Sequence, residues 1–92
     1  MVVGSLRVRL LVREARSLKD KRQVLRSIKD RLRNGFNVSV AEVEAQDNRQ
    51  LIVLGLAVVG NEKVHVRTTL EQMLAALRVH PVAELLDHEL DV

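Results

Sequence analysis

The 92-residue sequence has no cysteine, tryptophan or tyrosine, and it has one phenylalanine and one proline. Without cysteine the chain has no disulfide, no thiolate nucleophile and no cysteine ligand for a metal, which fits a reducing compartment. The longest apolar run, Leu51 to Val59, is far too short to span a bilayer. The N-terminal segment carries arginines within its apolar stretch, unlike a signal peptide. These absences predict a cytoplasmic protein without a membrane segment.

The composition is typical of a globular protein, with 47% apolar and 29% charged residues. The length suits one domain over residues 1–92. Charge is unevenly distributed, because residues 1–33 carry eleven Lys and Arg against three acids, whereas residues 34–92 carry four against nine. A basic first third followed by an acidic remainder is expected for a protein with a polyanion as partner. Codon bias or heat adaptation would equally explain why eleven of the fifteen cations are arginine.

The first two predicted elements are a strand and a helix. Residues 2–13 alternate between apolar and polar side chains, the pattern of a strand with one face in the core. Ser17 is predicted to cap the helix, with Asp20 completing an acidic variant of the capping box. Asn34-Gly35 is predicted to end it, with Gly35 in the left-handed conformation.

Four further elements follow. Residues 37–45 predict a short edge strand that ends in polar side chains, whereas residues 51–59 are apolar on both faces and predict a central strand. Asn61 is predicted to cap a second helix, which must stop by His80 because Pro81 follows. Residues 82–92 predict a last strand with an acidic side.

The order strand, helix, strand, strand, helix, strand specifies an α+β fold of the ferredoxin-like, split βαβ type. Right-handed crossovers then give a four-stranded antiparallel sheet in the order 4-1-3-2, with both helices on one face. The stretches SLKDKRQVLRSIKDRLRNGFNVSVAEV and LGLAVVGN also resemble the YlxP-like family of small, uncharacterised bacterial proteins. That resemblance implies a ferredoxin-like fold and, through neighbouring translation genes, a link to RNA; it implies no catalytic residues.

A ridge of five cations marks the first predicted helix, at spacings of three, four, three and four residues beside the apolar stripe. The basic ridge consists of Lys19, Arg22, Arg26, Lys29 and Arg33. Like charges at these spacings repel by ~0.2–0.5 kcal/mol per pair, and cations near a helix N-terminus are unfavourable. Two interpretations stay open: a solvated face, or a surface that binds the phosphates of structured RNA or the ribosome.

The arginines of the first strand have a structural explanation. In the predicted sheet the last strand runs beside the first, so Asp87, Glu89 and Asp91 can face the arginines. Those arginines are Arg7, Arg9 and Arg13. Glu42 and Glu44 lie on the predicted edge strand, where solvation is the expected role.

The sheet face without helices is predicted to be partly apolar and to form a homodimer interface. Its predicted contact residues are Leu11, Val43, Val53, Ala57 and Val59. The central strands have no aromatic side chain, which argues against RNA binding by base stacking.

The sequence contains no pattern of residues typical of catalysis. The three histidines have no metal-ligand spacing, and Ser17 is explained as a helix cap. We therefore expect no catalytic residue, metal or cofactor. Two functions remain: a non-enzymatic RNA- or ribosome-associated accessory protein that binds phosphates through the basic ridge, or a homodimeric protein-interaction or regulatory module without a nucleic-acid role.

Overall fold

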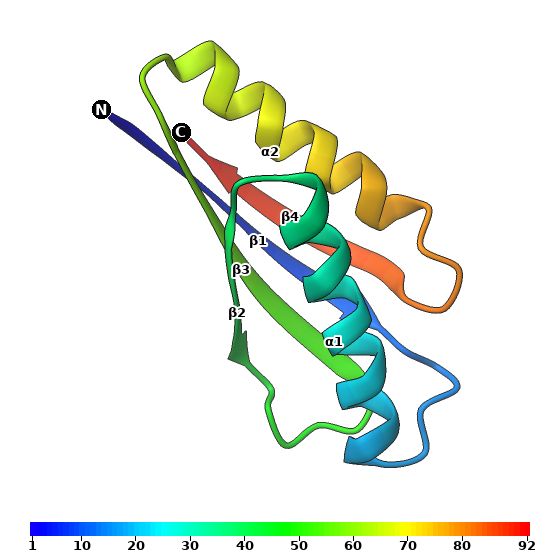
Figure 1. The fold of residues 1–92 in the computed structure, drawn as a ribbon. Coiled ribbons are helices and arrows are strands. Elements are labelled where there is room, and N and C mark those ends of the chain that lie inside the picture. Colours follow the sequence, from blue (N-terminus) through cyan, green and yellow to red (C-terminus); the bar gives the residue numbers. More distant parts are fainter.

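The computed structural model describes all residues, 1–92, and contains six elements in the order βαββαβ (Figure 1). The strands are β1 (Val2–Leu11), β2 (Ser39–Glu44), β3 (Leu51–Gly60) and β4 (Glu84–Asp91), and the helices are α1 (Leu18–Gly35) and α2 (Lys63–Arg78). The sheet order is β2-β3-β1-β4, and every neighbouring pair is antiparallel. The predicted α+β ferredoxin-like fold is therefore confirmed.

Both helices cover one face of the sheet, and their apolar stripes pack against alternate residues of the strands (Figure 1). The strand residues in this core are Leu6, Val8, Leu10, Val40, Ile52, Leu54, Leu56 and Val58. The helix residues in it are Leu25, Ile28, Leu32, Val66, Leu70, Met73, Leu74 and Leu77. The other side of the sheet, called the open face below, has no helix over it.

The start of α1 follows the sequence prediction, but its end does not. Ser17 Oγ accepts a hydrogen bond from the Asp20 amide at 3.1 Å, and the Asp20 carboxylate accepts one from the Arg16 amide at 3.0 Å. Gly35 is the last helical residue but has no positive φ, so the predicted left-handed end is wrong. Extended backbone at Phe36 ends the helix instead and lets its ring pack on the core.

The cap of α2 also differs from the prediction. The first helical hydrogen bond runs from the Val66 amide to the Glu62 carbonyl at 3.1 Å, which makes Glu62 the N-cap. Asn61 lies one residue too early to cap, and the Glu62 side chain makes no capping hydrogen bond. No helix in the structure is long and apolar enough to cross a membrane.

Candidate nucleic-acid interface

The basic ridge follows α1 on the side nearest the edge strand β2. Arg33 shows this placement, because its Nη2 donates to the Val40 carbonyl of β2 at 3.1 Å. The ridge residues are exposed except Lys29, which is half-buried. From Lys19 to Arg33 the ridge extends about 21 Å, at the helical rise of about 1.5 Å per residue.

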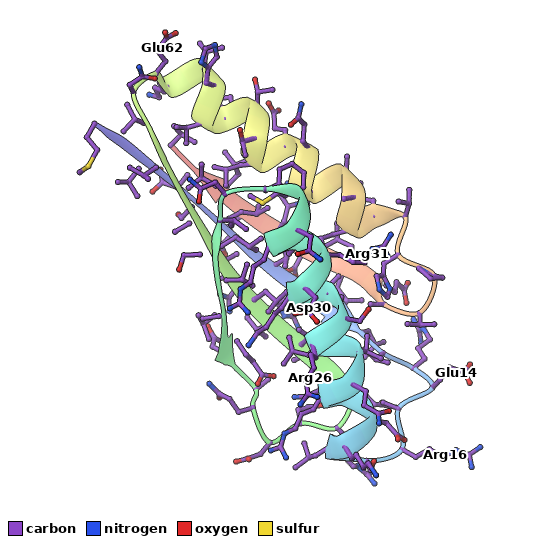
Figure 2. All side chains as sticks on the ribbon, in the orientation of Figure 1. Glu14, Arg16, Arg26, Asp30, Arg31 and Glu62 are labelled. Carbon is purple, nitrogen blue, oxygen red and sulfur yellow. The ribbon has the colours of Figure 1, made fainter.

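None of the five ridge cations has a carboxylate within 4.0 Å, since the ion pairs of the chain all involve other cations. Asp30 lies on the same helix, near Arg26 (Figure 2), but it is exposed and pairs with neither Arg26 nor Arg33. Four of the cations line a shallow hollow of about 310 Å³ together with Asp30 and Leu25. The ridge thus borders a hollow in which four cations face one carboxylate and none forms a close ion pair.

By contrast, the arginines of the predicted first strand are all paired, although β1 ends at Leu11 and Arg13 lies in the turn that follows it. The pairs are Arg7 Nη2–Glu44 Oε1 at 2.6 Å, Arg9 Nη1–Asp87 Oδ2 at 2.6 Å, and Arg13 Nη2–Glu84 Oε2 at 2.8 Å. The prediction that β4 supplies an acid to Arg9 is confirmed. Arg7 lies opposite Glu89 in the register but binds Glu44 of β2 instead. Arg13 binds Glu84, because Asp91 lies opposite Ser5 at the far end of β4.

The Arg7–Glu44 pair passes over β3, which lies between β1 and β2. Its hydrogen bonds are the main reason why the pKa of the Arg7 guanidinium is raised above its usual value. Val53 lies on β3 opposite Arg9 and Glu44, and it is only 2% exposed. Charged side chains therefore cover this part of the open face.

The other residues of the predicted dimer interface remain accessible to different degrees. Val43 is 46% exposed and Val59 is 56% exposed, Ala57 is exposed, and Leu11 is half-buried. Small side chains and Gly55 leave a second shallow hollow, of about 400 Å³, on the β2–β3 half of this face. Accessible apolar surface thus lies on that half, and Val3 of β1, which is opposite Val59, extends it.

One charged pair was missed by the sequence reasoning. Lys21 is fully buried, and its ammonium donates to the carbonyl oxygens of Ala45 at 2.9 Å, Gln46 at 3.3 Å and Leu51 at 3.2 Å. Lys21 Nζ also lies 3.1 Å from Glu42 Oε2. The Lys21 ammonium has three protons, and it donates all of them to the three carbonyl oxygens. Glu42 Oε2 therefore receives no hydrogen bond and interacts with Lys21 through the attraction of opposite charges alone.

A signal for this burial exists in the sequence. Lys21 precedes Leu25 by four residues and Ile28 by seven, so helical spacing places it within the apolar stripe. Glu42 is only 14% exposed, so the expectation of a solvated carboxylate is wrong there. The pair fastens α1 to the end of the β2–β3 hairpin and so fixes the position of the ridge.

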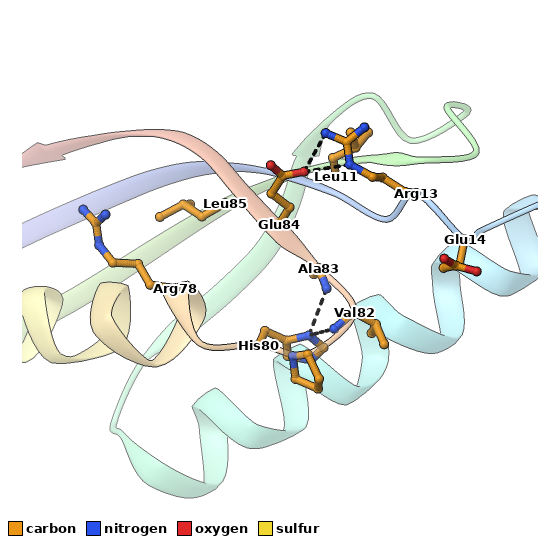
Figure 3. A pocket seen from close by; sticks show the side chains of 10 residues that line it. Leu11, Arg13, Glu14, Arg78, His80, Val82, Ala83, Glu84 and Leu85 are labelled. Carbon is orange, nitrogen blue, oxygen red and sulfur yellow. Dashed lines mark hydrogen bonds and ion pairs between the residues drawn. The ribbon is translucent and has the colours of Figure 1, made fainter.

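A hollow of about 720 Å³ lies where the turn after α2 meets the end of β1 (Figure 3). His80 organises this turn, since its Nδ1 accepts hydrogen bonds from the amides of Val82 and Ala83, both at 3.2 Å. Burial, and then the charge of Arg31, lower the pKa of His80. The hollow contains no nucleophile beside a base, and no three His, Asp or Glu side chains in the structure are arranged so that they could hold a metal ion.

Comparison with known proteins gives two matches. Residues 3–90 match the family model described as a protein of unknown function, DUF503. The chain is also 35% identical over 83 residues to the uncharacterised protein YlxP of Bacillus subtilis, covering 90% of each chain. These matches confirm the resemblance read from the SLKDKR and FNVSVAEV stretches, and the chain belongs to the DUF503 family.

Proposed function

We propose that the protein is a non-enzymatic accessory factor that binds structured RNA, free or in the ribosome, through the basic ridge of α1. One observation carries the proposal. Arg7 and Arg9 of β1, and Arg13 just after it, each have a carboxylate within 2.8 Å, whereas no ridge cation has one within 4.0 Å. A fold that neutralises one set of cations and leaves the other exposed retains the second set at a cost in stability.

The ridge favours phosphate contacts over base recognition. Its arginine forks and lysine ammonium groups suit phosphate oxygens, which fix position and carry no sequence information. The open face has no aromatic side chain on which bases could stack, and it carries the carboxylates of Glu44, Asp87 and Glu89. Binding is therefore expected to be nearly independent of sequence and to come from the helix side.

The test is binding of a fluorescent hairpin RNA at low salt by the wild type and by R22E/R26E. Neither side chain belongs to the core or makes a hydrogen bond, so the variant should fold and lose binding. K63E/R67E is the matched control, because it changes the charge equally on exposed positions of α2. Equal affinities of wild type and R22E/R26E, or no binding by the wild type, would reject the proposal and leave α1 with a solvated face.

A homodimer formed through the open face is the second candidate, supported by the hollow beside Val43, Gly55 and Ala57. The β4 half of that face carries a row of carboxylates, of which Glu89 and Asp91 have no ion-pair partner. If two molecules met only through their β2–β3 halves, the row of carboxylates on β4 of one molecule would stay away from the same row on the other. Sedimentation at high micromolar concentration tests it, with V43E expected to dissociate the dimer. A monomeric wild type would exclude this candidate.

A further inference from the structure

Two further arginines without a carboxylate partner lie in the loops near the N-terminal end of α1. The loop before this helix carries Arg16, and the β2–β3 loop carries Arg49. Although 33 positions separate them in the sequence, both line one polar hollow of about 640 Å³ together with Asp47, Asn48 and other loop residues. Both arginines are exposed, and neither has a carboxylate within 4.0 Å, Asp47 included.

The two loops are fastened to each other. Gln50 Nε2 donates to the carbonyl oxygens of Arg13 at 3.0 Å and Ala15 at 3.4 Å, and the Val12 amide donates to the Gln50 carbonyl at 2.8 Å. Asn48 Oδ1 accepts from the amides of Gln50 at 2.9 Å and Leu51 at 2.8 Å, which fixes the shape of the β2–β3 loop. The backbone that carries Arg16 and Arg49 is therefore held in one arrangement.

The buried Lys21 ties these loops to α1. Its ammonium binds the Ala45 and Gln46 carbonyls at the start of the β2–β3 loop, while its own helical turn carries Lys19 and Arg22 of the ridge. Figure 2 shows Arg16 extending away from the body of the protein at this end. The hydrogen bonds thus fix the backbone that carries the loop arginines relative to the first turns of α1, and the side chains of Arg16 and Arg49 have no ion-pair partner.

We infer that the RNA-binding surface continues past the N-terminal end of α1 onto Arg16 and Arg49, and that its ligand is double-helical RNA. This inference rests on the proposed function of the ridge. Cations carried on backbone segments that are held relative to one another suit phosphates that a double helix also holds at regular positions. A flexible single strand would instead need stacking surfaces, and the chain has one aromatic residue, Phe36, which is packed on the core. The loop arginines would then hold phosphates beyond those bound by the ridge.

The test is a salt titration of RNA binding by R16Q/R49Q, with K63Q/R67Q as a control of equal charge change on α2. Each phosphate contact contributes about 0.7 to 0.9 to the slope of log affinity against log salt, so losing two should make the slope shallower by about 1.4 to 1.8. The control should keep the wild-type slope. R16K/R49K should restore binding, because it restores the charges at both positions.

Two RNAs of equal phosphate number, a hairpin duplex and an oligouridylate, separate the ligand classes, and the duplex should bind tighter. The outcomes are distinct for the two proposals. If R22E/R26E abolishes binding while R16Q/R49Q keeps the wild-type slope, the extension to the loops is wrong and the ridge proposal stands. Equal binding of both RNAs overturns the assignment of a duplex ligand. Absence of binding by the wild type overturns both proposals.

Discussion

Lys21 Nζ lies 3.1 Å from the Glu42 carboxylate, inside a protein whose other ion pairs are all at the surface. The lysine is fully buried and the carboxylate nearly so, with 14% of its side chain exposed. Moving two charges out of water is costly, and their attraction offsets this cost only when the geometry and the added hydrogen bonds are good. Here Lys21 donates the added hydrogen bonds to three backbone carbonyl oxygens at the end of the β2–β3 hairpin.

Replacing Lys21 by methionine should destabilise the fold by roughly 3–5 kcal/mol, the usual cost of leaving one partner of a buried pair uncompensated. E42Q should cost less, because Lys21 keeps its three carbonyl acceptors. K21M/E42Q should be less destabilised than the sum of the single changes, since it leaves no isolated charge. Urea unfolding followed by circular dichroism measures all three variants. Additive losses would show that the two charges are not coupled.

The fold was predictable because its signals are local and repeated. Period-two alternation in β1, a doubly apolar β3 and a helical stripe in α1 each specify one element, and their order leaves few topologies. Helix ends were harder to predict. Asn61 is a residue type that often caps helices, but the first hydrogen bond of α2 makes Glu62 the N-cap. Gly35 is a residue type that often ends helices in the left-handed conformation, but here extended backbone at Phe36 ends α1 and lets the ring pack on the core.

The ion pairs of β2 could not be predicted from the sequence, because they depend on a β-bulge in this strand. Strict alternation places Glu42 and Glu44 on the same side of the strand. The register shifts between them, so Glu42 lies opposite Leu54 and faces α1, whereas Glu44 lies opposite Val53 on the open face. One extra residue thus sends the first carboxylate to Lys21 and the second to Arg7. No pattern in the sequence predicts that shift in register.

Gly4 to alanine should destabilise the fold by about 1–3 kcal/mol, the usual cost of overpacking a core. A Cβ at Gly4 would lie 2.5 Å from Val66 Cγ1 and 2.8 Å from Leu70 Cδ1, so these side chains of α2 would have to shift. Gly35 to alanine is the control, because a Cβ there meets nothing within 4 Å and the backbone φ is not positive. It should stabilise the fold by about 0.4–1 kcal/mol, because alanine narrows the conformations open to the unfolded chain. Thermal unfolding measures the stability of both variants. Loss of stability in the G35A control would contradict the finding that Gly35 has no positive φ.

Stability should fall between neutral and mildly acidic pH because of His80. Its pKa is lowered in the folded state, so below pH 6.5 the unfolded chain binds more protons and unfolding is favoured. The contribution is complete above pH 6.5 and is lost as the pH falls through the folded-state pKa. A proton on Nδ1 would oppose the Val82 and Ala83 amides, with Arg31 adding repulsion.

Urea unfolding of wild type and H80N at several pH values isolates this effect. The asparagine oxygen offers the turn an acceptor that does not titrate, so H80N should show a weaker pH dependence just below pH 6.5. Titration by NMR of R31Q should find a higher pKa for His80 than in the wild type, because one neighbouring positive charge is gone. Equal pH dependence of wild type and H80N would exclude His80 as the cause.

Arg9 and Arg26 should have opposite roles, although both are arginines of the basic first third. Arg9 binds Asp87 at 2.6 Å across neighbouring strands, so R9Q should lower the free energy of unfolding by roughly 0.2–1 kcal/mol and leave RNA affinity nearly unchanged. Arg26 has no acidic partner and lies on the ridge, so R26Q should leave stability unchanged or slightly higher.

The same R26Q variant should bind RNA more weakly and make the salt slope shallower by about 0.7 to 0.9, the contribution of one phosphate contact. Both variants lose one positive charge, so a general effect of net charge would weaken RNA binding equally in the two. Unfolding and a salt titration of hairpin binding therefore form one paired experiment. Equal RNA affinities of R9Q and R26Q would mean that any attraction comes from overall charge, and that the ridge of α1 holds no phosphate of its own.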